Sequence, residues 1–300
     1  MNSQENPWGW NMFKSIILVI LAVCSTLLSG CAAPQNNADL IHLRQLKEQA
    51  FSGNPESQYR LGVHYTTSSQ WSWDKVRGYN WFLDAAEAGH VAAQYMVGMC
   101  KLLGQGTKED SKGAMVWLIR AAEQGHSRSQ YQLGQAYLNG NGTAKDSLWG
   151  RYWLEQAART KHPEAQFLLA ALLSEGISAP PNRPEAWMWL KRAELNGQRN
   201  ASIALRKLAA ELTDREKKIG EQLADRFEDM GSDGLHTQPK IRYVQAALNR
   251  RGFSAGSEDG LYGPSTRMAV NEYLQQQELP RGSSIDVLIG SLRGRVQGNR

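Results

Sequence analysis

The chain has 300 residues, of which 41% are apolar and 21% charged. This composition allows two packed domains and argues against intrinsic disorder. The net charge is +5, and residues 239–300 carry +4 of it, from nine Lys and Arg against five Asp and Glu. Such a small excess argues against a dedicated nucleic-acid binder and permits only weak attraction to anionic polymers or lipid head groups.

Residues 1–30 are predicted to be an export signal. Residues 16–28 form an apolar run that is too short to span a bilayer comfortably. The run ends in Leu28-Ser29-Gly30-Cys31, which resembles the lipobox of bacterial lipoproteins. The resemblance implies cleavage before Cys31 and lipidation of Cys31. Because Ala32 follows, it also implies sorting to the outer membrane, with the protein facing the periplasm.

The alternative is an ordinary cleaved signal in which Cys31 is incidental, and Met1 and Met12 are alternative starts. Cys24 leaves with the signal in either case. With Cys31 lipidated, Cys100 remains alone and no intrachain disulfide is available. We expect Cys100 to be a small buried thiol rather than a reactive one. Residues 31–38 are predicted to be a flexible linker.

A 36-residue period runs through the middle of the chain. Three sets of residues recur with this spacing. They are the tryptophans Trp81, Trp117, Trp153 and Trp189, the aromatic residues Tyr59, Tyr95, Tyr131 and Phe167, and the glutamines Gln58, Gln94, Gln130 and Gln166. A fixed period of roughly 20 to 50 residues marks a stacked repeat protein in which each unit buries its apolar face against the next. We therefore expect the four tryptophans to be core residues.

Each unit is predicted to be a pair of antiparallel helices. In the second unit the first helix is expected over residues 91–103, where Gly104-Gln105-Gly106 ends it. The second helix of each unit is expected to begin at a polar N-cap residue: Asp74, Asp110, Asp146 and Asn182. These features resemble the Sel-one-like repeats, relatives of the tetratricopeptide repeat, over residues 53–212. The resemblance implies an α-solenoid that acts as an adaptor or scaffold for other proteins.

Capping helices are expected at both ends, so that the solenoid spans residues 39–229. Thr213 and Glu216 have the spacing of a capping box for the last of these helices. Histidines recur in the turns between units at His90, His126 and His162. Equivalent atoms of neighbouring units lie about 8–10 Å apart, whereas zinc ligands must converge to about 2 Å from the ion. We therefore predict no metal site there.

Four tryptophans outside the consensus are the candidates for a partner-binding surface, because an exposed tryptophan can anchor an interface. They are Trp71, Trp73, Trp149 and Trp187. The alternative is that they add packing between units.

After a predicted linker over residues 230–238, a different pattern occupies residues 239–293, and residues 294–300 form a basic tail. An amphipathic helix ends at Gly252, the tight loop Asp259-Gly260-Leu261-Tyr262-Gly263 follows, and Pro264 begins a second helix. A third short helix holds Val287, Leu288 and Leu292. The ordered series from Val244-Gln245 to Tyr273 resembles the three-helix peptidoglycan-binding domain of bacterial wall enzymes.

This resemblance implies attachment to peptidoglycan beside the glycine loop. The candidate contact residues are Asp259, Tyr262, Gly263 and Arg267. Asp can accept hydrogen bonds, Arg can pair with a carboxylate, and Tyr can stack on a sugar. The alternative is that Asp259 and the glycines order the loop and that Tyr262 packs inward.

We predict no catalytic residues and no cofactor. No cysteine follows Cys100, and His236 is the only histidine after His162, so neither cysteine-dependent transpeptidation nor a zinc amidase is supported. The favoured function is that of a non-enzymatic periplasmic lipoprotein that binds peptidoglycan and acts as an adaptor or scaffold. Its other expected partners are the membrane, through the lipid anchor, and an unidentified envelope protein. We expect no binding to nucleic acid. A structural tether between outer membrane and wall is one alternative, and a wall-modifying enzyme is another.

Overall fold

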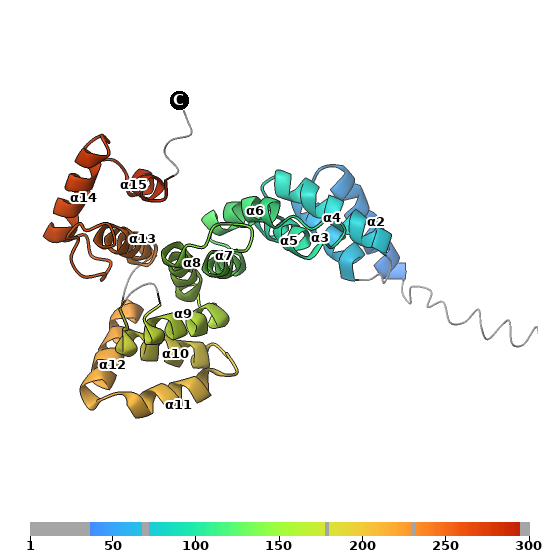
Figure 1. Ribbon diagram of the computed structural model, residues 1–300. Helices are drawn as coiled ribbons and strands as arrows, with labels where there is room; N and C mark the ends of the chain where they lie inside the picture. The colour runs from blue at the N-terminus through green and yellow to red at the C-terminus, as the bar shows by residue number, and fades with distance from the viewer. Residues whose placement is uncertain (1–36, 68–71, 178–179, 230–231, 295–300) are drawn as a thin grey trace, which may run out of the picture.

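The computed structural model describes residues 37–67, 72–177, 180–229 and 232–294 (Figure 1). Within these residues the chain forms helices α2 to α15 and no strand. The predicted fold class, an all-α solenoid followed by a small helical domain, is confirmed. None of the described helices is both long and apolar enough to cross a bilayer. The predicted signal and Cys31 lie outside the described residues.

Four consecutive helix pairs form the solenoid. The first helices of the pairs are α3 (Pro55–Thr67), α5 (Val91–Leu103), α7 (Ser127–Asn139) and α9 (Pro163–Glu175). The second helices are α4 (Ser72–Glu87), α6 (Ser111–Glu123), α8 (Ser147–Arg159) and α10 (Arg183–Leu195). The prediction for residues 91–103 matches the bounds of α5.

Polar caps fix where the second helices begin. Asp110, Asp146 and Asn182 accept hydrogen bonds from backbone N–H groups of the first turns of α6, α8 and α10, as predicted. Asp74 is the exception, because α4 already begins at Ser72 and Asp74 lies within its first turn. The prediction that Asp74 is an N-cap was therefore wrong.

The recurring histidines cap the first helices. The Nδ1 atoms of His90, His126 and His162 accept hydrogen bonds from the backbone N–H groups of Ala93, Ser129 and Ala165, at 3.1, 3.3 and 3.4 Å. Each histidine ring also packs against the consensus tyrosine of the preceding unit, with centroids 4.7 to 4.9 Å apart. The histidine position is thus explained by helix capping and by packing between units.

The recurring glutamines join each unit to the one before it. Gln94, Gln130 and Gln166 each donate through Nε2 to the carbonyl oxygen of an alanine near the end of the preceding second helix, at 3.4, 3.1 and 2.9 Å. Gln58 makes the same bond to Ala50 of α2 (Asn37–Phe51). The helix α2 therefore takes the place of a missing second helix and caps the stack.

The consensus tryptophans are more buried in the third and fourth repeats than in the first two. Trp153 and Trp189 are buried, as expected of core residues. Trp81 and Trp117 are only half-buried; Trp81 packs edge-on against Phe51, and Arg120 covers the ring of Trp117 at 4.7 Å. Cys100 is buried, and burial raises the pKa of its thiol to about 11, which makes it unreactive.

Two helices close the other end of the solenoid: α11 (Ala201–Glu211) and α12 (Asp214–Asp229). The predicted capping box precedes α12. The backbone N–H of Glu216 donates to Thr213 Oγ1 at 3.3 Å, and the backbone N–H of Thr213 donates to Glu216 Oε2 at 2.8 Å. This reciprocal pair satisfies two backbone donors at the helix start.

The C-terminal domain consists of α13 (Ser232–Asn249), α14 (Pro264–Gln276) and α15 (Ile285–Leu292). The predicted linker over residues 230–238 is therefore wrong from Ser232 onward, because α13 passes through Pro239. Proline has a helix-compatible φ and costs only one helical hydrogen bond plus local strain. It does not have to mark the start of this helix. The start of α14 at Pro264 is as predicted.

Candidate functional site

The loop between α13 and α14 is organised by Gln245, which is buried on α13. Its Nε2 lies 3.0 Å from both Asp259 Oδ1 and the carbonyl oxygen of Leu261, and its Oε1 accepts from the backbone N–H of Gly260 at 2.9 Å. Thr266 Oγ1 lies 3.1 Å from the same Nε2. One buried amide side chain thus fixes the loop that carries the predicted contact residues.

Asp259 is bound within this loop. Its Oδ1 also accepts from the backbone N–H of Leu261 at 2.9 Å, and its Oδ2 accepts from Ser257 Oγ at 2.9 Å. Partial burial alone would raise the pKa of Asp259, but the donors from Gln245, Leu261 and Ser257 lower it overall. The carboxylate is therefore ionised at neutral pH and orders the loop.

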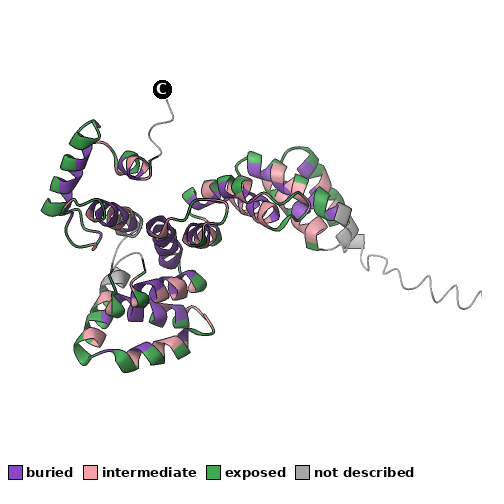
Figure 2. Cartoon of the chain, viewed as in Figure 1, coloured by how far each residue is buried: buried purple, intermediate pink, exposed green. Residues whose placement is uncertain are grey.

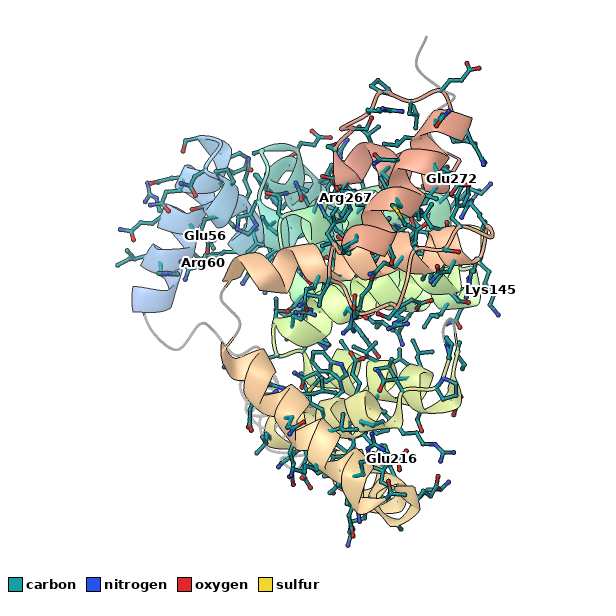
Figure 3. All side chains as sticks on the ribbon, turned by 90° about the vertical axis from the view of Figure 1, so that its left-hand side faces the viewer. Glu56, Arg60, Lys145, Glu216, Arg267 and Glu272 are labelled. Carbon is teal, nitrogen blue, oxygen red and sulfur yellow. The ribbon has the colours of Figure 1, made fainter. Side chains whose placement is uncertain are left out.

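Asp259, Tyr262 and Arg267 are exposed, and Gly263 is half-buried. Tyr262 is 50% exposed, and Arg267 is exposed on the first turns of α14 (Figure 3). Partial burial raises the pKa of Tyr262, and the positive charge of Arg267 opposes that effect. Leu261 and Met268 are exposed beside them. These residues offer one aromatic ring, one cation and an apolar surface to solvent.

The two glycines of the loop differ in their geometry. Gly260 has φ +79°, and a Cβ there would lie 3.0 Å from the carbonyl oxygen of Gln238. Glycine is therefore required at that position. Gly263 has φ −80° as the N-cap of α14, and a Cβ there would have no atom within 4 Å. The turn geometry does not require glycine at position 263.

The partner-surface prediction fails for two of the four tryptophans. Trp149 and Trp187 are 8% and 9% exposed, so neither offers an indole face to a partner. Trp187 packs in the core between α10 and the capping helix α12, and Trp149 is covered by the C-terminal domain. Trp71 lies outside the described residues, as does the side chain of Trp73.

The C-terminal domain docks on α8, which is buried at every position from Leu148 to Arg159 (Figure 2). A helix buried on all sides must be covered on its outer face as well. Trp149 stacks on Tyr152 at 4.4 Å and meets Tyr243 of α13 edge-on at 4.9 Å. The guanidinium of Arg293 lies 4.2 Å from the centre of the Trp149 ring. The third repeat and the C-terminal domain therefore share one apolar core.

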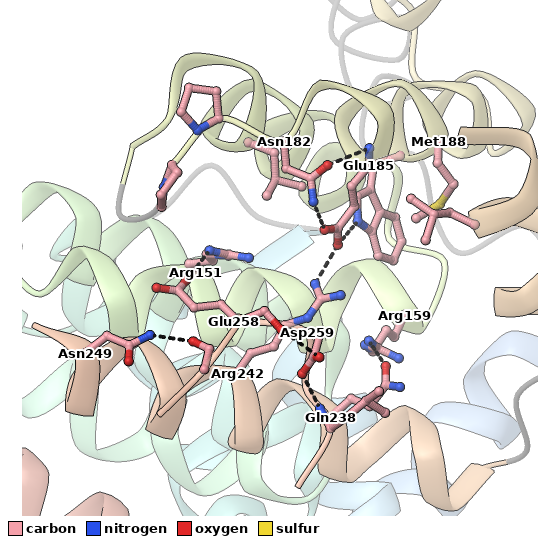
Figure 4. A pocket seen from close by; sticks show the side chains of 18 residues that line it. Arg151, Arg159, Asn182, Glu185, Met188, Gln238, Arg242, Asn249, Glu258 and Asp259 are labelled. Carbon is pink, nitrogen blue, oxygen red and sulfur yellow. Dashed lines mark hydrogen bonds and ion pairs between the residues drawn. The ribbon is translucent and has the colours of Figure 1, made fainter. Parts of the chain in front are cut away.

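A row of largely buried charges lies beside this aromatic cluster. Figure 4 shows Arg151, Glu185, Arg242 and Glu258 of this row. Arg242 Nη1 of α13 lies 3.3 Å from Glu155 Oε1 of α8 and 2.5 Å from Glu185 Oε1 of α10. Arg151 of α8 pairs with Glu155 at 3.2 Å and reaches Glu258 of the loop at 3.5 Å. Burial alone would raise the pKa of Glu185, but Arg242 lowers it overall. These pairs fix the orientation of the docked domain.

A cleft of about 590 Å³ lies between the solenoid and the C-terminal domain. Helices α8, α9, α10 and α12 contribute residues to it, as do α13 and the loop of Asp259. Asp259 and Leu261 line the cleft, whereas Tyr262 and Arg267 do not. The candidate site thus has one part on the loop and the start of α14 and a second part in the cleft that the loop shares with the solenoid.

Two short segments, which the sequence-based prediction of no catalytic residues did not take into account, have the residue spacing of catalytic motifs. Gly252-Phe253-Ser254-Ala255-Gly256 has the Gly-x-Ser-x-Gly spacing, but a nucleophile elbow joins a strand to a helix, and the described residues contain no strand. Ser72-Trp73-Asp74-Lys75 has the Ser-x-x-Lys spacing at the start of α4, where the side chains of residues 72 and 73 are not described. Neither string carries an argument for catalysis.

Comparisons with known proteins agree with this architecture. The Sel1 repeat family model matches residues 55–90, 91–126, 127–160 and 163–198. The family model described as "Putative peptidoglycan binding domain" matches residues 237–281. No curated protein matches the chain significantly.

Among solved structures, a Sel1 repeat protein from Oxalobacter formigenes is 29% identical, with a TM-score of 0.52 over 61% of this chain and 78% of that one. The c5321 protective antigen of uropathogenic Escherichia coli strains, which displays an SLR fold, is 18% identical, with a TM-score of 0.40 over 85% of this chain and 68% of that one. The second likeness is too distant to support an argument. From the family matches and the first structure, this chain carries four Sel1 repeats followed by a peptidoglycan-binding domain.

Proposed function

We propose that this protein is a non-enzymatic lipoprotein of the bacterial envelope that holds a protein partner close to the wall. The repeats and the C-terminal domain support a scaffold or binding role. The observation that carries the proposal is the docking of the wall-binding domain on α8, through Trp149 and Arg242. This contact fixes the solenoid relative to the C-terminal domain, so that a partner bound to the repeats would be held at a set position relative to the wall.

For wall binding, we assign the contact to the exposed part of the loop. Tyr262 can stack on a sugar ring, and Arg267 can pair with a carboxylate of the polymer. Deleting residues 239–300 would be a poor test, because it would uncover Trp149 and leave Glu155 and Glu185 without Arg242. Point variants at the loop avoid this problem.

The test is sedimentation of the full chain with purified peptidoglycan. Tyr262→Ala and Arg267→Ala should each weaken pelleting by about tenfold, as expected for losing one contact that dominates an interface. Arg281→Ala, which removes an exposed arginine elsewhere in the same domain, is the control and should pellet like the unaltered chain. Unchanged pelleting of both loop variants would contradict the assigned contact.

For membrane attachment, the lipobox-like sequence ending in Cys31 is the support. Cys31→Ser should release the protein from the membrane fraction. The variant would lack the acyl chains on residue 31, and several acyl chains together are what would anchor the protein stably to a membrane. Cys24→Ser, inside the predicted signal, is the matched control and should remain bound. Membrane retention of Cys31→Ser equal to that of the control would exclude lipid anchoring.

The adaptor and tether alternatives differ in whether a protein partner exists. Purification of the full chain from crosslinked cells should recover a second protein in stoichiometric amount. Recovery of wall fragments alone would favour the tether. An enzyme is tested separately by incubating the chain with purified peptidoglycan, where release of soluble fragments would overturn the non-enzymatic proposal.

A further inference from the structure

A second cavity, of about 640 Å³, lies where the C-terminal domain meets the loop between α7 and α8. It shares no lining residue with the cleft described above. Its solenoid side consists of Tyr137 and residues 143–147, and its other side consists of Arg250, Leu292 and Arg293. The third repeat and the C-terminal domain thus form this cavity together.

Cations outnumber anions in this cavity. Lys145, Arg250 and Arg293 line it with a single carboxylate, that of Asp146, so three positive groups and one negative group give a net charge of +2. Asp146 is already engaged as the N-cap of α8, where its Oδ1 accepts a backbone N–H of the first turn at 3.0 Å. Arg250 also acts on Glu258, which lies outside the lining, so we assign the site to Lys145 and Arg293.

Arg293 is a largely buried cation whose guanidinium makes no hydrogen bond within the described part of the chain. Its side chain is 8% exposed, and its Nε lies 3.8 Å from Asp146 Oδ2, an ion-pair distance that is too long for a hydrogen bond. The guanidinium lies 4.2 and 5.0 Å from the ring centres of Trp149 and Tyr137. Stacking on rings covers the faces of a guanidinium and leaves its in-plane N–H groups for an anion.

The second repeat shows the same region without a neighbouring domain. There Lys101 stands at the position of Tyr137, and its Nζ pairs with the cap Asp110 at 3.1 Å. In the third repeat the tyrosine removes that cation, and an arginine of the C-terminal domain takes its place at the longer distance. Lys145 also stands where the second repeat has Glu109. The third repeat thus exchanges an internal ion pair and an anion for a positively charged cavity shared between domains.

The lining favours a phosphate group over other anions. Arginine forms paired hydrogen bonds to phosphate, lysine supplies a point charge, and the hydroxyl groups of Thr143 and Ser147 add donors. A phosphate monoester carries a charge of about −1.5 to −2 at neutral pH, which matches the excess of positive charge better than one carboxylate does. The cavity has the size of a small-molecule site, so it has room for the group that carries the phosphate.

We propose that this cavity binds a phosphate monoester through Arg293 and Lys145, and that the bound phosphate bridges the third Sel1 repeat and the C-terminal domain. The inference goes beyond the proposed function, because the proposed wall contacts, Tyr262 and Arg267, lie outside this cavity. The phosphate belongs either to a soluble sugar phosphate or to a lipid head group, and the experiment separates these two sources.

The test measures binding of three probes to the full chain. Calorimetry compares glucose 1-phosphate with glucuronate, a sugar of similar size that carries a carboxylate, and the phosphate should bind about tenfold tighter. Flotation compares vesicles of phosphatidylcholine with and without phosphatidic acid. Flotation that increases with phosphatidic acid would assign the phosphate to a lipid head group, and glucose 1-phosphate binding without such an increase would assign it to a soluble ligand.

Variants connect this binding to the cavity. Lys145→Glu introduces the residue of the second repeat at an exposed position and should weaken glucose 1-phosphate binding by about tenfold or more. Lys108→Glu makes the same charge change in the corresponding loop of the second repeat and should bind like the unaltered chain. Arg293→Lys keeps the charge, loses the planar fork and should weaken binding by about tenfold.

Lys145→Glu decides the test if Arg293→Lys loses stability, because Lys145 is exposed and makes no contact on which the docking of the domains depends. Absence of binding to both glucose 1-phosphate and phosphatidic acid would overturn the inference. Glucuronate binding as tight as that of glucose 1-phosphate, or phosphate binding that Lys145→Glu leaves unchanged, would overturn it as well.

Discussion

At the scale of single residues, Arg242 joins the C-terminal domain to two helices of the solenoid. It is largely buried and lies against both Glu155 and Glu185. Burial alone would lower the pKa of Arg242, but these two carboxylates raise it well above its ordinary value. The attraction offsets the desolvation of the charges only while all three groups are present.

Arg242→Met should therefore destabilise the protein by about 3 kcal/mol or more, because it leaves the buried carboxylate of Glu185 without its paired cation, and Glu155 keeps only Arg151. The measurement is urea unfolding followed by tryptophan fluorescence. Lys240→Met is the control, since Lys240 pairs with the exposed Asp286 and such a pair contributes about 1 kcal/mol or less. Equal unfolding midpoints for the two variants would show that the buried pairs do not hold the interface.

The sequence alone predicted the roles of residues that act within one helix better than the roles of residues that contact distant parts of the chain. Asp110, Asp146 and Asn182 are caps as expected, because a cap depends on its own helix and on little else. The burial of Trp149 could not be read in the same way, because the residue that covers it, Tyr243, lies far along the chain. The ordering role of Asp259 was one of two interpretations, and its hydrogen bonds support that one.

At the scale of helices, the histidine caps make the repeats sensitive to acid. Burial lowers the pKa of His126 and His162; for His162 the charge of Glu164 partly opposes this effect, and the charge of Arg128 adds to it for both. Each ring accepts a backbone N–H through Nδ1, which only the neutral ring can do. The stability that these caps contribute is present above the ordinary pKa of 6.5 and is lost as pH falls through the lowered pKa.

We expect the melting temperature to fall between pH 7 and pH 5 and to fall less in His126→Asn. Asparagine caps a helix without titrating in this range. His126→Ala should lose about 1 kcal/mol at pH 8, where the cap is intact in the unaltered chain. Melting curves recorded by circular dichroism at each pH provide the measurement. An Asn variant with the same pH dependence as the unaltered chain would assign the acid effect to other groups.

Helix positions were the most predictable feature. The bounds of α5 and the start of α14 were predicted because the repeat period, the paired glycines and Pro264 are local signals. The extension of α13 to Ser232 was missed because Pro239 was taken as a boundary. The sequence of α8 did contain an indication of docking. Trp149, Tyr152 and Glu155 of α8 stand where the preceding unit has Gly113, Val116 and Ile119. Sequence could not tell which surface these residues meet.

At the scale of the whole molecule, the shared core couples the two domains. Trp149 contacts Tyr152, Tyr243 and Arg293 at the centre of this interface. Trp149→Ala should cost about 3 to 5 kcal/mol, the range for a large aromatic residue removed from a core. Because the loss falls between the domains, they should then unfold in separate transitions.

Scanning calorimetry tests this prediction by the number of transitions. Trp117→Ala is the control, because Trp117 is half-buried within the second repeat and does not touch the C-terminal domain's core. It should lower stability less and leave the transitions coupled. A single cooperative transition in Trp149→Ala would show that the domains are held together by other contacts.

The attachment of α13 to α8 also decides how force would travel through the chain. Helices α9 to α12 lie between α8 and α13 in sequence, but the contact of Trp149 with Tyr243 bypasses them in space (Figure 1). If the chain were pulled from the wall and from the membrane at once, tension would pass directly from α13 into α8. The fourth repeat would then carry load only through the contact of Arg242 with Glu185 of α10, and the capping helices α11 and α12 would lie outside the direct path.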